Sequence, residues 1–134
     1  MKISNFRSQI KTNYEHRTNE GANKEFALRV IKLVQSMPKT IEGCAIANQI
    51  VRSGMSVAAN YRAACRSRSR AEFIARVGTV LEEADETLLW LELSGDAKIL
   101  PRKRIESLRI EADELVAIMV ASRKSAASNL KSKI

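Results

Sequence analysis

The sequence contains few of the residues that build turns and bind metals. Its 134 residues include five glycines, two prolines, two cysteines and one histidine. An all-β domain needs a turn about every ten residues, so this shortage of glycine and proline argues against that class. A zinc site or a di-iron bundle requires several histidines or cysteines, which the single His16 cannot supply. We therefore expect no metal and no other cofactor.

Signals for export and for membrane insertion are also lacking. There is no run of about 18 apolar residues, so we expect no membrane-spanning helix. The first residues, MKISNFRSQIKTNYEHR, lack the apolar stretch of a secretory signal. On one helix, Cys44 and Cys65 would lie roughly 30 Å apart, whereas a disulfide requires Cα atoms within about 7 Å. Two reduced cysteines and no export signal predict a cytoplasmic protein.

Residue sets typical of catalysis are missing as well. There is no Gly-rich phosphate loop, no Ser/His/Asp set and no Cys/His pair. Carboxylates do cluster in one segment, but at about 100° per helical residue they spread around the helix and do not converge on one atom. A solvated or ion-paired face explains them better than a reaction centre. We expect no enzyme and assign no catalytic residue. These carboxylates are Glu82, Glu83, Asp85, Glu86 and Glu92.

What the sequence does contain is aliphatic residues at helical spacing. Apolar residues make up 45% and aromatic residues 4%, so the core must be mainly aliphatic. The apolar spacing predicts four amphipathic helices joined by loops of about three to six residues, which favours an all-α, up-down-up-down antiparallel four-helix bundle. The predicted helices span Asn23–Ser36, Thr40–Cys65, Ser69–Ser94 and Pro101 to about Ser125.

Capping residues support these boundaries. Thr40 is expected to cap the second helix, and Ser69 with Glu72 forms a capping box at the start of the third. Gly95 is expected to end the third helix in a left-handed conformation, and Pro101 suits the first turn of the fourth.

Polar segments flank the predicted bundle. We divide the chain into an N-terminal arm at 1–21, the bundle at 22–125 and a basic tail at 126–134. The arm is expected to be disordered alone or ordered by a partner, and the last helix is expected to fray from about Ser125.

The second and third helices can be aligned about the turn at residues 67 and 68. Gly54 lies inside a helix, where it costs about 1 kcal/mol relative to alanine, so a close approach of two helices is the expected reason for it. The alignment places Gly54 against Leu81. It also places Arg52 beside Glu82 and Glu83, where an ion pair would have a structural role.

The apolar faces of the helices are wider than an isolated bundle needs. A stripe somewhat over 100° wide is enough, yet the first two helices have apolar arcs of roughly 160° to 180°. On the third helix several apolar residues fall outside the core stripe. An oversized core with ordinary exposed apolar residues is one explanation. We favour association of the bundles into a closed ring or dimer. The candidate interface residues are Trp90, Leu89, Leu93 and Leu28.

Basic residues are concentrated at one predicted end. The chain has 23 lysines and arginines against 15 acids, a net charge of +8, and so attracts polyanions. Four arginines and no acid lie around the turn between the second and third helices, and an up-down bundle brings that turn together with the arm and tail. A merely solubilising basic surface is the alternative. The candidate nucleic-acid-binding residues are Arg62, Arg66, Arg68, Arg70, Arg123 and Lys124, and a smaller cluster of Lys98, Arg102, Lys103 and Arg104 lies at the opposite end.

Three short segments carry a resemblance to a known family. The segments are RSGMSVAANYRAA at 52–64, SRAEF at 69–73 and EEADET at 82–87. Over about residues 26–121 the chain resembles the four-helix-bundle family of 23S rRNA intervening-sequence proteins. It departs from the family at Ala63-Ala64, where many members have an acid and a small residue, and at Gly78-Thr79, where Gly-Ser is common. Both departures leave the choice of partner open.

The resemblance implies a ring, often a pentamer, without an established enzymatic role. Some members of the family are accessory proteins of retroelements that bind nucleic acid and a reverse transcriptase. Together with the charge pattern, this predicts an oligomer that binds nucleic acid, RNA more than DNA, with little sequence specificity. The alternative is a structural adaptor that docks an acidic protein, such as a reverse transcriptase or a ribosome-associated protein.

Overall fold

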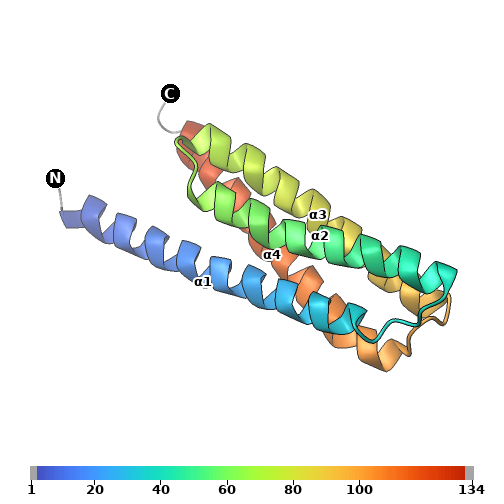
Figure 1. Cartoon of the computed structure of the whole chain (residues 1–134). Coiled ribbons are helices and arrows are strands. Elements are labelled where there is room, and N and C mark those ends of the chain that lie inside the picture. The colour runs from blue at the N-terminus through green and yellow to red at the C-terminus, as the bar shows by residue number, and fades with distance from the viewer. Residues whose placement is uncertain (1–2, 132–134) are drawn as a thin grey trace.

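The chain turns back on itself three times to build a bundle of antiparallel helices (Figure 1). In the computed structural model, the backbone is described for residues 3–131 and the side chains for residues 19–129. The described part contains four helices and no strand, which confirms the expected all-α, up-down-up-down bundle. The helices are α1 (Ile3–Val34), α2 (Ile41–Cys65), α3 (Arg70–Asp96) and α4 (Arg102–Lys131).

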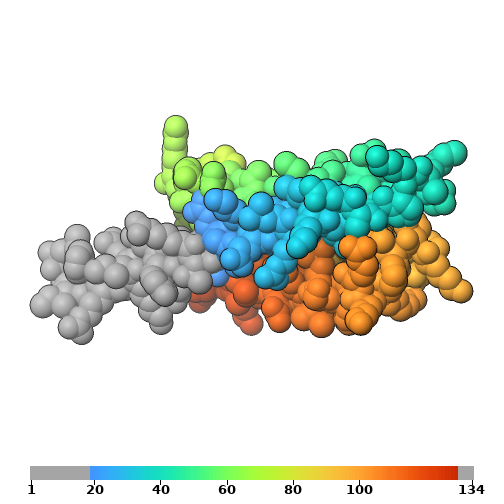
Figure 2. All heavy atoms as spheres, turned by 60° about the horizontal axis from the view of Figure 1, so that its bottom comes forward, coloured from blue at the N-terminus to red at the C-terminus, as the bar shows by residue number. Residues whose placement is uncertain are grey.

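The helices form a square in which each contacts its two neighbours. α2 packs against α1 and α3, while α4 packs against α3 and, less extensively, against α1. α1 and α3 lie across the diagonal, and in the described part of the chain their backbones do not come close to each other. Figure 2 shows α1 between α2 and α4 on one face of the molecule.

Hydrogen bonds at the helix ends confirm the predicted caps. The Thr40 Oγ1 accepts a hydrogen bond from the Gly43 backbone N–H at 3.0 Å. The Ser69 Oγ accepts one from the Glu72 N–H at 3.1 Å. The Glu72 carboxylate reaches back to the N–H of Arg68 at 2.9 Å, one residue before the cap. The pKa of Glu72 is held below its usual value mainly by this hydrogen bond and, to a smaller extent, by one from the Arg76 side chain.

The outer boundaries of the bundle differ from those expected. α1 begins at Ile3 rather than Asn23, and α4 continues to Lys131 instead of ending near Ser125. Both predictions were wrong because they required an apolar stripe, whereas a polar segment without proline can also be helical. The division into 1–21, 22–125 and 126–134 as separate units stays a prediction.

The end of α3 also differs from the prediction. Gly95 is buried inside the helix, against Ile105 and Arg102 of α4, and has no positive φ. Among the residues described, Lys98 is the only non-glycine with a positive φ, at 57°. The Ser94 carbonyl accepts the Ile99 N–H at 2.9 Å, so the left-handed turn comes three residues after Gly95.

The core is mainly aliphatic, as the composition requires, and α1 and α2 approach each other closely at Gly54. A Cβ added to Gly54 would lie 2.7 Å from Cγ1 of Val30, so the glycine allows these two helices to approach. The prediction that Gly54 faces Leu81 was wrong, because the glycine side of α2 points to α1 and not to α3. The largest side chains that are fully buried include Phe26, Val30, Ile50, Val57, Tyr61, Leu91 and Met119.

Candidate nucleic-acid interface

Cationic residues gather at the end of the bundle where α2 turns into α3. Figure 1 shows this turn beside the C-terminal end of α4, as the up-down topology predicts. The guanidinium of Arg123 extends from α4 to within 3.7 Å of where a Cβ on Gly78 of α3 would lie. We use the name basic pole for Arg62, Arg66, Arg68, Arg70, Arg123 and Lys124.

The cations of the basic pole differ in how they are paired. The Arg62 Nε donates to the Glu20 Oε1 at 2.9 Å, and the Arg66 Nη1 lies 3.5 Å from the same oxygen. The side chains of Arg68 and Arg70 form no ion pair with the residues whose side chains are described. Arg68 is exposed and Arg70 is half-buried. Arg123 and Lys124 form no ion pair with the described residues either, so the pole combines two arginines already held by a carboxylate with four cations that are open to an anion.

Sequence reasoning did not identify Glu20 as part of this site, because it assigned the residue to the arm. The helical register contains the signal. Gly54 faces Val30, and because α1 and α2 are antiparallel, moving toward the pole by about two turns on α2 and almost three on α1 brings Arg62 close to Glu20. Locating Glu20 from sequence would have required the correct start of α1.

The interior beneath the basic pole shows no activated group. Burial raises the pKa of the Cys65 thiol and, more strongly, that of the Tyr61 hydroxyl. A thiol shifted in this direction stays protonated at neutral pH and is a poor nucleophile. Both cysteines are free, Cys44 on the surface and Cys65 half-buried.

Over the side chains described, no group of three or more His, Cys, Asp or Glu residues could hold a metal ion. None of the described helices has an apolar stretch able to span a bilayer.

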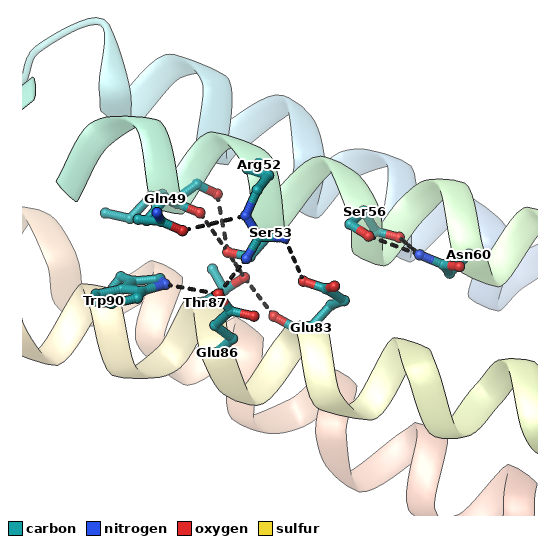
Figure 3. A network of polar contacts seen from close by, with 10 residues as sticks. Gln49, Arg52, Ser53, Ser56, Asn60, Glu83, Glu86, Thr87 and Trp90 are labelled. Carbon is teal, nitrogen blue, oxygen red and sulfur yellow. Dashed lines mark hydrogen bonds and ion pairs between the residues drawn. The ribbon is translucent and has the colours of Figure 1, made fainter. Parts of the chain in front are cut away.

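A polar network joins α2 to α3 in the segments that carry the family resemblance (Figure 3). Arg52 bridges two carboxylates of α3, Glu86 and, at 3.3 Å, Glu83. Its hydrogen bond holds the pKa of Glu86 below the usual value. The expected pairing of Arg52 with Glu83 is confirmed, whereas Glu82 points to solvent and Glu86, one turn further along α3, takes its place. Because both carboxylates are engaged, this network is a structural link and not an open site.

The same interface contains a buried hydroxyl pair. The Thr87 Oγ1 donates to the Ser53 Oγ at 2.7 Å, and both residues are fully buried. Nearby, the Asn60 amide donates to the backbone carbonyl of Ser56 at 2.9 Å and to its Oγ at 2.8 Å. All of these groups bond within the chain.

The predicted interface residues lie on two separate surfaces. Leu28 is on α1 and 57% exposed, while Leu89 and Leu93 are on α3, 48% and 39% exposed. Trp90 differs from them, since it is half-buried against the core and its Nε1 donates to Glu86 at 3.4 Å. Three of the four residues are thus well exposed, whereas Trp90 is only partly exposed.

Comparisons with known proteins agree with the fold and with the segments described above. A model of the 23S rRNA-intervening sequence protein family matches residues 22–121. A crystal structure of a protein of unknown function from the S23 ribosomal protein family of Bacteroides thetaiotaomicron is similar, with 30% sequence identity and a TM-score of 0.75. The similarity covers 82% of this chain and 98% of that one. No curated protein matches.

Proposed function

Because the chain belongs to the 23S rRNA-intervening sequence protein family, we propose that it is a non-enzymatic, self-associating cytoplasmic protein that binds nucleic acid through its basic pole. RNA is the favoured ligand over DNA. The observation that supports the proposal is the gathering of Arg62, Arg66, Arg68 and Arg70 around the α2–α3 turn, beside the end of α4, which carries Arg123 and Lys124 about two turns before that end. Arg68 and Arg70 are unpaired among the described residues, so they are available to phosphates.

The physical basis is attraction to the phosphate backbone. Arginine side chains replace condensed counterions along a nucleic acid, and the released ions drive binding without reading the sequence. Base stacking would require exposed aromatic side chains. Among the residues described, Phe26, Tyr61, Phe73 and Trp90 are all buried or half-buried. Binding is therefore expected to tolerate many sequences.

The test is the salt dependence of binding to a labelled single-stranded RNA. Fluorescence anisotropy with a 20-nucleotide RNA should give a log–log slope of affinity against salt of roughly −2 to −4, since each phosphate contact contributes about −0.7. A DNA of the same sequence measures the preference for RNA. Absence of RNA binding at about 50 mM salt, where phosphate contacts are strong, would reject the proposal.

Replacing Glu20 with glutamine is expected to tighten RNA binding. The carboxylate of Glu20 holds Arg62 and Arg66 and so competes with phosphate for them. Removing its charge should raise affinity roughly two- to tenfold at about 50 mM salt and make the salt slope more negative by about one. Glu42→Gln is the matched control, because it removes the same charge at the opposite end. Equal effects of the two variants would show that only net charge matters.

The adaptor function remains the second candidate, and one observation favours it. Arg62 and Arg66 already hold a carboxylate, Glu20, so the same side chains suit an acidic protein surface. Capture experiments from nuclease-treated lysate separate the two functions. A protein that stays bound after nuclease treatment and is lost on replacing the pole arginines favours the adaptor.

Self-association is the other part of the proposal, with a ring of five favoured by the family resemblance. It is supported by the exposed Leu28, Leu89 and Leu93. In a ring, the basic poles of several subunits would add into one positive rim. Light scattering at micromolar concentration gives the mass directly, and a monomer at all concentrations tested would reject this part.

A further inference from the structure

The molecule has two exposed apolar surfaces that differ in charge. The first is a groove between α1 and α2, which lie side by side in Figure 2. Its floor and walls come from Ala27, Leu28 and Ile31 of α1 and from Met55, Ala58 and Ala59 of α2. Leu28 is 57% exposed and Met55 is 49% exposed. No described segment of the chain covers these side chains.

Cations border this groove. Lys24 and Lys32 flank Leu28 at intervals of four residues, so the three share one stripe of α1, and both lysines are exposed. Arg62 lines the groove from α2. The acid that lines it, Glu20, is already held by Arg62 and Arg66. The groove therefore presents an apolar floor with a positive rim.

The second surface is a ridge on α3 with the opposite charge. Leu89 and Leu93 stand one turn apart and are both exposed. Glu82, Asp85 and Glu92 are exposed around them and form no ion pair with the described residues, while the nearest cations on the flanking helices, Arg52 and Arg109, are paired with other carboxylates. Arg109 also attracts Glu92 electrostatically. No lysine or arginine occurs between residues 77 and 97. The ridge therefore presents two leucines with a negative rim.

We propose that the α3 ridge of one copy of this chain seats in the α1–α2 groove of the next copy. This inference rests on the proposed self-association and names its two surfaces. Leu89 and Leu93 would fill the space beside Leu28 and Met55, and the ridge carboxylates would face Lys24 and Lys32. Ridges entering grooves are the usual way in which helices pack, and opposite rims fix which surfaces meet.

A single chain cannot make this contact with itself. α1 and α3 lie across the diagonal of the bundle, so groove and ridge face different directions. The contact is therefore head-to-tail, with the ridge of one copy in the groove of the next. A chain of copies joined in this way has a free groove at one end and a free ridge at the other, and closing the chain into a ring fills both.

Another exposed apolar region fits the ridge less well. Ile110 and Ile118 of α4 border the groove between α1 and α4, which is lined by Glu25, Glu111 and Glu114. These carboxylates would repel the acidic ridge, apart from Glu111, which pairs with Arg29 at 2.7 Å. Charge complementarity therefore favours the α1–α2 groove over the α1–α4 groove as the binding site of the ridge.

The test uses one variant for each surface. Leu28→Glu with Met55→Glu places acids in the groove, and Leu89→Gln with Leu93→Gln removes the apolar ridge without adding a charge that the altered groove would attract. All four positions are exposed, so the helical fold should survive, which circular dichroism verifies. Each variant alone should be monomeric by light scattering. An equimolar mixture should form a one-to-one dimer and nothing larger, because it retains one intact groove and one intact ridge.

Each other outcome has a defined meaning. If the unmodified chain is an oligomer and either variant stays fully assembled, the altered surface is not in the interface and the inference is wrong. Two monomeric variants whose mixture stays monomeric would also overturn it. Ile118→Lys is the control and should leave the oligomer intact. A monomeric unmodified chain would instead reject self-association itself, whereas loss of RNA binding would not affect this inference.

Discussion

Replacing Arg66, Arg68 and Arg70 together with alanine is expected to weaken RNA binding by roughly ten- to a hundredfold at about 0.1 M salt. The three side chains surround the α2–α3 turn, and those of Arg68 and Arg70 are unpaired among the described residues. Losing three phosphate contacts should also make the salt slope shallower by about two. Ser69 and Glu72, which cap α3, are kept, so helicity and assembly should not change.

The matched control removes the same number of charges at the other end of the bundle. Lys98, Lys103 and Arg104 lie around the α3–α4 turn and are exposed. Replacing them with alanine should weaken binding far less, since they lie a full helix length from the basic pole. If both triple variants lose affinity equally, binding follows net charge and the assignment of the pole is wrong.

Replacing Gly54 with alanine is expected to lower the free energy of unfolding by about 1 to 2 kcal/mol. The new methyl would stand 2.7 and 2.9 Å from the two γ-carbons of Val30, which are too close for carbon atoms in contact. Overpacking of this kind typically costs about 1 to 3 kcal/mol, and the better helix propensity of alanine offsets up to about 1 kcal/mol. Urea unfolding at fixed protein concentration measures the difference.

Gly78→Ala is the control, because it makes the same substitution within α3. A Cβ there meets only the flexible end of Arg123, at 3.7 Å. This variant should be stabilised by up to about 1 kcal/mol through helix propensity alone. If Gly54→Ala is as stable as Gly78→Ala, the close approach of α1 and α2 does not require a glycine.

The sequence predicted most of the fold because its signals are local. Thr40, Ser69 and Pro101 mark helix starts through hydrogen bonds within a few residues. The pairing of Arg52 with Glu83 followed from the short α2–α3 turn, which leaves little choice of register. The short turn does not determine how α2 is rotated about its own axis. For this reason Gly54 was assigned to Leu81 of α3 and not to Val30 of α1.

The candidate site was predicted less completely. The arginines near the turn are close in sequence, so their clustering was visible, and topology placed the end of α4 beside them. Glu20 lies 42 residues from Arg62, and only the packing of α1 on α2 brings the two together. Exposure of Leu28, Leu89 and Leu93 agreed with the apolar periodicity. Trp90 was harder to place, because a large side chain beside the core stripe can bend back over the core.

The brevity of the α2–α3 connection has a consequence for recognition. Only residues 66–69 separate the two helices, so Arg62 and Arg70 are anchored to helical backbone and Arg66 and Arg68 to a short, capped turn. A ligand that docks here does not have to order a long loop, and the entropic cost of binding is confined to the rotation of long side chains. Such a preorganised array favours a ligand whose anionic groups recur at similar intervals, as they do along a polyphosphate backbone.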